Sequence, residues 1–437
     1  MRFLVSFLLF LVSVSAAPFY RRIDLVSPAN DSFYFPPSGY ESSTVGTILK
    51  TRQIDNPFTA SIIPQKIKGV YQFLVRSEDT FGNANAIVTT LFVPSNADGK
   101  KILSYQIAED SANIDSAPSY TLRETSDSNL QADEIMMQAC INQGWYVVVP
   151  DYEGPKSAFG AGIQAGRATL NSMRAVLNSG STYGISSDAK VAYWGYSGGS
   201  IATGWASLLE PSYAPELKKN TAGYAMGGVV ANIQHTAEAN MGNIGAGLII
   251  TAINGLSQEY PDLLEFVDEN VYADKLKAFT SPLTDDPASF LFATWAEYFK
   301  TGTSTLSNPV VTAITTANSM VSSSYIPTAP LFMYNSIIDE IIPASDATTL
   351  YTNLCKGGAS ISYKQDLVFG HIVESIVGSA DAFVWLQARF AGTAQTGCTK
   401  QFSLSNALNL QALIGFGEIF AEPLLTLLLS GKMSSVF

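Results

Sequence analysis

The sequence contains very little histidine, cysteine and charge. Its 437 residues include only two histidines and three cysteines, and 14% of them are charged whereas 47% are hydrophobic. This balance excludes a disordered chain and predicts a globular protein with a large buried core. The cysteines and histidines do not have the spacing of a zinc site, so we expect neither a metal nor another cofactor.

Positive charge is also scarce. Lys and Arg together number 25 against 37 Asp and Glu, which gives a formal net charge of −12. Proteins that bind nucleic acid use clusters of Lys and Arg, and no such cluster occurs, so we expect no nucleic-acid partner. The acidic composition gives no electrostatic attraction to anionic membranes either. Any contact with lipid must therefore be apolar.

Uninterrupted apolar runs long enough to span a membrane are missing, so we expect no stable membrane span. Residues 1–17 carry one arginine, a short apolar run and small residues at their end, a pattern typical of a signal peptide. Residues 401–437 are also apolar, but two glutamates and a proline interrupt them. We expect a secreted, extracellular protein whose C-terminal tail packs on the core.

The cysteines suit an extracellular location, where disulfides are stable. An odd count leaves one cysteine unpaired. Cys355 and Cys398 both lie near the C-terminal end of the predicted core, and we expect these two to pair. Cys140 lies in an apolar, helix-like segment and is predicted to be a buried thiol. Asn30 begins an Asn-Asp-Ser glycosylation sequon, which predicts a modified surface loop.

Residues 195–199, Gly-Tyr-Ser-Gly-Gly, have the G-x-S-x-G pattern of a nucleophile elbow. They follow a β-prone run at 191–194 and precede an apolar stripe at helical spacing over 201–209. A strand, a sharp glycine-rich turn and a helix lift the serine hydroxyl off the sheet. We therefore predict that Ser197 is a nucleophile.

A serine nucleophile needs a base, and only two histidines are available. In α/β-hydrolases the chain order is Ser, then Asp or Glu, then His. Asp339 follows a strand predicted at 331–334, and His371 lies on a predicted loop before a helix that starts near Ser379. We predict Asp339 as the acid and His371 as the base. His235 precedes the acid in the chain, so we predict a structural or surface role for it.

The oxyanion of an acyl-transfer reaction needs hydrogen-bond donors. One is predicted to be the backbone N–H of Gly198, the residue after the nucleophile. The second is predicted to come from the loop at 108–111, which follows a strand predicted at 101–107. No glycine run of the HGGG type is present there. The residues alone leave the donor within this loop open.

Predicted strands and helices alternate through much of the chain, which is typical of a parallel α/β sheet. These elements are predicted at 101–107, 131–143, 144–151 and 161–178. Residues 230–325 break the alternation with apolar, helix-like patches. We predict an α/β-hydrolase fold with a mostly parallel sheet and an inserted helical cap. Its core is divided between residues 18–229 and 326–400.

Several segments together resemble the secretory lipase family of fungi. They follow one another over most of the mature chain. They are Ser-Tyr-Gln at 104–106 before Glu109 and Asp110, Pro-Asp-Tyr-Glu-Gly-Pro at 150–155, Trp-Gly-Tyr-Ser-Gly-Gly at 194–199, Ile-Ala-Thr-Gly-Trp-Ala at 201–206, Asp339 and Glu340 with Pro343, and Gly370 with His371. The Pro-Asp-Tyr-Glu-Gly and Gly-Tyr-Ser-Gly-Gly segments are fairly specific at this spacing.

The resemblance implies an α/β-hydrolase with a helical cap and no metal, which hydrolyses acylglycerols at a lipid–water interface. It implies that Ser197, Asp339 and His371 form a catalytic triad. It also implies that Asp110 joins Gly198 in the oxyanion hole, through its backbone N–H and through its side chain.

The chain departs from the family pattern at Ser116, where relatives often carry a cysteine. One family disulfide is therefore absent, and the pair Cys355 and Cys398 would correspond to the retained one. This departure leaves the triad unaffected but removes a cross-link from the N-terminal half.

Other functions are compatible with the same residues. An esterase for short-chain or acetylated small-molecule esters fits them too, because acyl-chain length depends on the shape of the cap. A serine peptidase would need polar groups that fix a substrate amine or carboxylate, and residues 230–325 show no such cluster. A non-catalytic binding protein usually lacks a triad member, and all three are present. The leading prediction is a monomeric, secreted triacylglycerol lipase.

Overall fold

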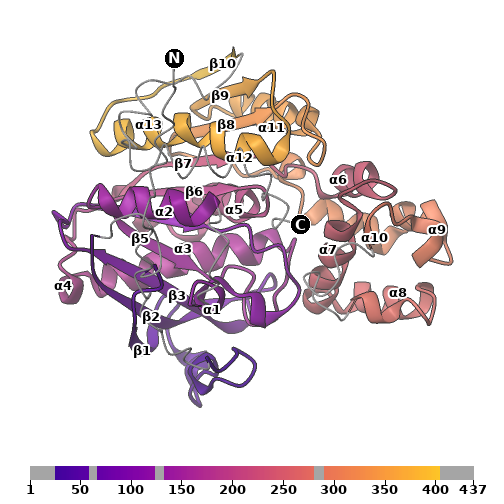
Figure 1. Cartoon of the computed structure of the whole chain (residues 1–437), viewed down its shortest axis with the longest axis horizontal. Coiled ribbons are helices and arrows are strands. Elements are labelled where there is room, and N and C mark those ends of the chain that lie inside the picture. Colours follow the sequence, from indigo (N-terminus) through magenta and orange to yellow (C-terminus); the bar gives the residue numbers. More distant parts are fainter. Residues whose placement is uncertain (1–24, 59–65, 124–131, 280–289, 404–437) are drawn as a thin grey trace, which may run out of the picture.

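A ten-stranded sheet forms the centre of the molecule (Figure 1). The computed structural model describes residues 25–58, 66–123, 132–279 and 290–403. The strands are β1 (Ile48–Ile54), β2 (Ile67–Glu78), β3 (Ala84–Pro94), β4 (Lys101–Gln106), β5 (Tyr146–Pro150), β6 (Lys190–Tyr196), β7 (Thr221–Gly227), β8 (Leu331–Ser336), β9 (Ile361–Asp366) and β10 (Cys398–Ser403).

The strand order is β1-β2-β3-β5-β4-β6-β7-β8-β9-β10. The strands from β5 to β10 in this order are all parallel to one another. In contrast, β1, β2 and β3 are antiparallel to one another, and β3 is antiparallel to β5. The sheet is therefore mostly parallel, which confirms the predicted α/β-hydrolase fold.

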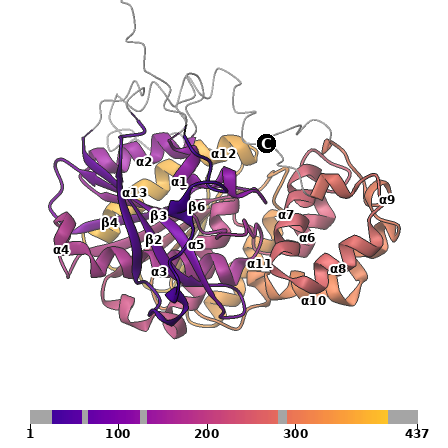
Figure 2. The same ribbon diagram turned by 90° about the horizontal axis from the view of Figure 1, so that it is seen from below.

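The central strands are apolar along their whole length because helices cover both faces of the sheet. Val147, Val148 and Val149 of β5 are completely buried, as expected for a strand with no solvent-facing side. The covering helices are α3 (Gly162–Asn178), α5 (Gly198–Tyr213) and α11 (Ala344–Lys356) on one face, and α2 (Ala132–Asn142) and α13 (Ser379–Phe390) on the other. Figures 1 and 2 show this layered arrangement.

A separate group of helices lies beside the sheet, between β7 and β8 in sequence (Figures 1 and 2). These helices are α6 (Ile233–Asn240), α7 (Ala246–Glu259), α8 (Pro261–Asn270), α9 (Trp295–Tyr298) and α10 (Pro309–Ala317). They enclose an apolar cluster of their own, which includes Leu263, Phe266 and Phe299. All five lie within the helical insertion predicted at 230–325.

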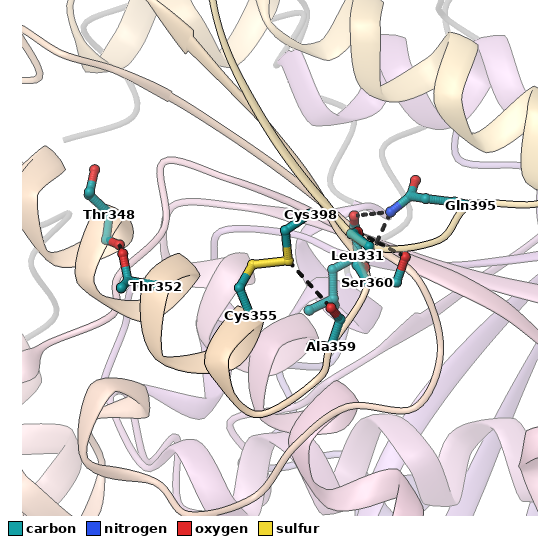
Figure 3. Close-up of a disulfide and its surroundings, with 9 residues drawn as sticks. Leu331, Thr348, Thr352, Cys355, Ala359, Ser360, Gln395 and Cys398 are labelled. Atoms are coloured by element: carbon teal, nitrogen blue, oxygen red, sulfur yellow. Dashed lines mark hydrogen bonds between the residues drawn. A yellow bond between two sulfur atoms is a disulfide. The ribbon is translucent and has the colours of Figure 1, made fainter.

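A disulfide joins Cys355 at the end of α11 to Cys398, the first residue of β10 (Figure 3). Their Cα atoms are 6.1 Å apart. In the described part of the chain β10 is an edge strand that pairs with β9 alone, so the bond fastens this edge to helix α11. The third cysteine, Cys140, is a free thiol buried in α2, and burial raises its pKa.

Two details differ from the sequence expectations. His371 does not lie on a loop, because it is the first residue of α12 (His371–Val377). The carboxylate of Glu340 accepts a hydrogen bond from its backbone N–H at 2.8 Å, and this contact satisfies a donor at the helix start. In addition, β10 ends at Ser403 and so crosses the boundary predicted at residue 400.

The remaining short helices are α1 (Pro118–Thr121) and α4 (Gly180–Tyr183). Within the described part of the chain, no helix is both long and apolar enough to cross a membrane. The predicted signal peptide at 1–17 and residues 404–437 of the predicted tail lie outside the described residues.

Candidate active site

Ser197 lies in the tight turn between β6 and α5. Its backbone has φ 52° and ψ −122°, a combination that L-residues rarely adopt. The turn leaves only 8% of the residue exposed and places it at the N-terminus of α5. The first backbone N–H groups of that helix have no partner within it, and they carry partial positive charge. Ser197 therefore lies where negative charge is stabilised.

The glycines around Ser197 are required by close backbone contacts. A Cβ atom on Gly195 would lie 2.3 Å from the carbonyl oxygen of Gly199, and one on Gly199 would lie 2.1 Å from that of Gln106. Both distances are far below van der Waals contact. The G-x-S-x-G pattern thus lets β6 and α5 meet tightly enough to form the turn.

His371 lies between Ser197 and Asp339. Its Nε2 is 2.8 Å from the Oγ of Ser197, and its Nδ1 is 2.7 Å from the Oδ2 of Asp339. The side chain of His371 is only 4% exposed and that of Asp339 is completely buried. The Tyr196 hydroxyl donates to the carbonyl oxygen of His371 at 2.7 Å. The structure thus brings the three predicted residues into one hydrogen-bonded chain.

Asp339 is held by the turn that follows β8. Its Oδ1 accepts hydrogen bonds from the backbone N–H groups of Ile341 at 3.0 Å and Ile342 at 2.7 Å. This leaves Oδ2 directed at His371. The neighbouring Glu340 points elsewhere, as predicted, but it accepts from the backbone of the same histidine. Asp339 thus holds the imidazole ring of His371, and Glu340 holds its backbone.

His235, the second histidine, lies on α6 and contacts Asp346 rather than Ser197. Its Nδ1 lies 2.9 Å from the Oδ2 of Asp346, a residue in the first turn of α11. The His235 side chain is 42% exposed. This contact links the helical insertion to the core. It agrees with the structural or surface role predicted for this histidine.

Asp110 lies in the loop after β4, directly over Gly198. Its backbone has φ 48°, another uncommon conformation. A Cβ on Gly198 would lie 1.7 Å from the Oδ1 of Asp110, so only glycine leaves room for this carboxyl group. Burial raises the pKa of Asp110 to about 7. The structure therefore brings together the two residues predicted for the oxyanion hole.

Tyr152 supports the loop that carries Asp110. Its hydroxyl donates to the carbonyl oxygen of Ile107 at 2.7 Å and accepts from the backbone N–H of Glu109 at 3.4 Å. Tyr152 is 2% exposed, and its own carbonyl oxygen accepts from the side chain of Gln164 at 2.9 Å. It belongs to the Pro-Asp-Tyr-Glu-Gly segment, to which sequence reasoning gave no role. Only the fold shows which backbone groups it contacts.

Asp133, in the first turn of α2, supports the same loop from the other side. It accepts hydrogen bonds from the backbone N–H of Ala108 and from the Tyr105 hydroxyl, the latter at 2.6 Å. Burial raises the pKa of Asp133. The backbone groups of three successive loop residues are thus held by side chains from two separate segments.

Replacing Tyr152 with phenylalanine is expected to lower kcat about tenfold and to leave KM nearly unchanged. The loosened loop would misplace a donor that acts in the transition state rather than in substrate binding. Steady-state kinetics on a soluble ester measure both constants. Tyr146→Phe is the matched control, because Tyr146 begins β5, at the end of the parallel strands opposite the Asp110 loop, and its hydroxyl donates to the carbonyl oxygen of Tyr183. An unchanged kcat in Tyr152→Phe would contradict the expectation.

Buried carboxyl groups gather around this site. Burial raises the pKa of Asp110, Glu134 and Asp151 to about 7. Burial, followed by neighbouring carboxylates, raises the pKa of Glu109 and Glu153 well above the ordinary glutamate value. The folded protein therefore holds protons that the unfolded chain has already released at neutral pH.

These shifts predict that stability falls as the pH rises. Between the ordinary carboxyl pKa near 4 and the folded value near 7, the native state binds more protons than the unfolded state, so the unfolding free energy decreases across that window. We expect the Tm at pH 8 to be at least about 5 °C below that at pH 5. Glu153→Gln should flatten the dependence, whereas Glu265→Gln on the surface should not. A Tm that rises from pH 5 to pH 8 would refute this.

Among the described residues, no group of three or more His, Cys, Asp or Glu side chains is arranged to hold a metal ion.

Comparison with known proteins places this site in a family. Residues 121–397 match the secretory lipase family. Lipase 1 of Candida albicans is 44% identical over 423 residues, which cover 93% of this chain and 89% of that protein. The chain belongs to the secretory lipase family. Lipase A of Arthroderma benhamiae, another relative, is 36% identical over 92% of this chain and 88% of its own length.

Solved structures agree with this family assignment. The closed-state crystal structure of Candida antarctica lipase A superposes with a TM-score of 0.84 at 29% identity, covering 92% of this chain and 96% of that one. A rice cell wall degrading esterase from Xanthomonas oryzae superposes with a TM-score of 0.63 at 16% identity, and this likeness shows the fold alone. The chain is therefore a secretory lipase, an enzyme of the carboxylic ester hydrolase class.

Proposed function

We propose that this secretory lipase hydrolyses triacylglycerols through Ser197, His371 and Asp339. The observation that carries the proposal is the unbroken chain from the Ser197 hydroxyl through the imidazole to a buried carboxylate. An ionised carboxylate only accepts hydrogen bonds, so Nδ1 carries the proton toward Asp339. In the neutral ring, Nε2 is then free to accept the serine proton.

Acylation begins when His371 removes the proton from Ser197 and the serine oxygen attacks the ester carbonyl. The imidazolium that forms is stabilised by Asp339. Collapse of the tetrahedral intermediate breaks the ester C–O bond, and the leaving alcohol takes the proton from Nε2. Water then hydrolyses the acyl-enzyme by the same route, with His371 again acting first as base and then as acid.

The negative oxygen of the intermediate is stabilised by the backbone N–H groups of Gly198 and Asp110. Gly198 opens α5, so its N–H has no acceptor within the helix. Asp110 lies in contact range of Gly198, on a loop that Tyr152 and Asp133 hold in place. Such preorganised donors typically contribute about 10²–10³-fold to the rate.

The acyl chain is proposed to enter a cavity beneath the helical insertion, with a volume of about 900 Å³ including the open space at its mouth. The cavity begins at Ser197 and Gly198 and extends between α5 and helices α6 to α10. Its walls are apolar and include Ile201, Leu248, Leu256, Phe266 and Ile314. A fatty acyl chain gains free energy by leaving water for such a surface, roughly 0.8 kcal/mol for each buried CH₂. The insertion thus acts as the cap over the active site.

The extended, largely apolar lining of this cavity favours long-chain esters over the alternative substrates. A short-chain or acetyl ester would leave most of the apolar wall without a partner, and a peptide would place polar groups against it. The expected result is that purified mature protein hydrolyses olive oil at a rate comparable to or above that for tributyrin. Strong preference for tributyrin, with little action on olive oil, would replace the lipase assignment with that of a short-chain esterase.

Ala252→Phe is expected to shorten the preferred acyl chain. Ala252 is a half-buried residue of α7 in the cavity wall, and a phenyl ring there would fill space that a long acyl chain needs. Hydrolysis of p-nitrophenyl palmitate should fall about tenfold, whereas that of the butyrate should change less than about twofold. Ile244→Phe, on the outer surface of the insertion, is the control. Equal losses on both esters would show that this cavity does not hold the acyl chain.

We also propose that the protein is secreted as a monomer and modified at Asn30. The signal-like residues 1–17, the family and the disulfide support secretion. Asn30 lies in an exposed turn, where a glycan would meet no steric barrier. Size-exclusion chromatography with light scattering, before and after enzymatic deglycosylation, tests both statements.

A further inference from the structure

A second cavity also opens at Ser197. It has a volume of about 1370 Å³ including its mouth, and it runs toward α2 and the ends of β4, β6 and β8. The two cavities share Ser197, Asp110 and Leu248 among the described residues. His371 lies in the wall of the second cavity and not among the described lining residues of the acyl cavity. Ser197 is therefore the meeting point of two differently placed chambers.

The position of His371 decides which part of an ester enters the second cavity. When the tetrahedral intermediate collapses, Nε2 must deliver its proton to the oxygen of the leaving alcohol, so that oxygen lies within hydrogen-bond reach of the imidazole. The alcohol part must then extend into the chamber that His371 lines. The acyl part extends to the opposite side, toward Gly198 and the helical insertion.

The second cavity is more polar than the acyl cavity, although residues such as Ile107, Met136 and Ile372 make much of its wall apolar. Its polar lining residues include Ser111, Thr121, Asp133 and Ser375. Asp133 already accepts from the Tyr105 hydroxyl at 2.6 Å and from the backbone N–H of Ala108. A carboxylate offers about four acceptor positions, so its contacts with the described residues leave two for further donors. A hydrocarbon group would leave these acceptors unpaired, whereas a hydroxyl-bearing group would satisfy them.

We propose that the second cavity binds the leaving alcohol and recognises its free hydroxyl groups, with Asp133 as their acceptor. The preferred substrates are then esters of polyols that retain unesterified hydroxyls, namely mono- and diacylglycerols, in addition to triacylglycerols. This inference rests on the proposed function of Ser197 and His371. It extends that function by assigning a substrate class to a specificity-determining residue outside the triad.

The test compares two esters with the same acyl group and a three-carbon alcohol. They are 1-monobutyrin, which has two free hydroxyls, and n-propyl butyrate, which has none. Both form the same butyryl-enzyme on Ser197, so the ratio of their kcat/KM values depends on the alcohol alone, and its change in a variant separates binding of the alcohol from its intrinsic leaving-group reactivity. We expect a ratio of at least about 10 for the wild type, the size of one hydrogen bond to a charged group.

Variants of Asp133 assign this preference to one residue. Asp133→Ala should lower the monobutyrin to propyl butyrate ratio about tenfold, and Asp133→Asn, which keeps an acceptor oxygen, should retain part of it. Any disturbance of the oxyanion loop affects both esters alike and cancels in the ratio. Glu134→Gln is the matched control, since Glu134 is the neighbouring carboxylate and is not in the cavity wall. It should keep the wild-type ratio.

Two results would overturn the inference. The first is a wild-type ratio near one, and the second is a high ratio that survives Asp133→Ala. In both cases propyl butyrate hydrolysis that depends on Ser197 would leave the proposed esterase chemistry standing. Failure of the wild type to hydrolyse either ester is a distinct outcome, which would overturn the proposed function and this inference together.

Discussion

Alanine at Ser197 or at His371 is expected to lower kcat by at least about 10³-fold, with the folded structure retained. The serine variant loses the atom that bonds to the acyl group. The histidine variant loses both the base for attack and the acid for the leaving alcohol. Because the two residues act as one unit, the double variant should be hardly less active than either single one. Titration of released fatty acid measures the loss.

Two observations control this experiment. A fluorophosphonate probe should label the wild type and should not label Ser197→Ala, which separates loss of the nucleophile from loss of folding. His235→Ala is the matched control for the other histidine, because His235 contacts Asp346 rather than Ser197. We expect it to keep wild-type kcat. Wild-type rates in Ser197→Ala or His371→Ala would refute the assignment of the triad.

Gly198→Ala is expected to lower kcat about 10²-fold, the second largest effect, although it adds a single methyl group. The new Cβ would lie 1.7 Å from the Oδ1 of Asp110, so the loop that carries Asp110 would have to move. Both proposed oxyanion donors lie at this contact. Affinity for a trifluoromethyl ketone, which forms an oxyanion at the active site, should fall in parallel with kcat, whereas KM for an ester should change little.

A double variant separates the steric clash between the new methyl group and the Asp110 carboxyl group from other effects of that methyl group. Asp110→Gly removes the carboxyl group, retains the backbone N–H and tolerates the positive φ of this position. If the collision causes the loss, Gly198→Ala combined with Asp110→Gly should be no less active than Asp110→Gly alone. Multiplicative losses in the double variant would show that the carboxyl group is not the obstacle.

The three reacting side chains could be predicted from the sequence, because each is indicated by a local pattern or by the small number of residues of its type. Ser197 lies in a glycine pattern that only a sharp turn requires. The choice of His371 follows from the presence of two histidines and one permitted chain order. The alternation of strands and helices gave the fold class and the position of the insertion. These inferences require only local sequence patterns or the fixed order of the triad residues along the chain.

Contacts between distant segments could not be obtained in this way. Nothing local indicates that Tyr152 supports the loop of Asp110, because their contact depends on the pairing of β4 with β5. The start of α12 at His371 depends on Glu340, which is 31 residues earlier in the chain. The antiparallel strands β1 to β3 were also not foreseen. The contrast between the two cavities depends on helices that meet only after folding.

The division between core and insertion has a consequence for how such enzymes diversify. Ser197, Asp339 and Asp110 lie in turns and loops of the core, and Gly198 and His371 are the first residues of the core helices α5 and α12, whereas much of the acyl cavity wall comes from α6 to α10. Mutations in those helices reshape the chamber without displacing a reacting atom. Duplicated genes can therefore retain the same catalytic residues and diverge in acyl-chain preference. Grafting the segment between β7 and β8 from one paralogue into another should transfer its chain-length profile.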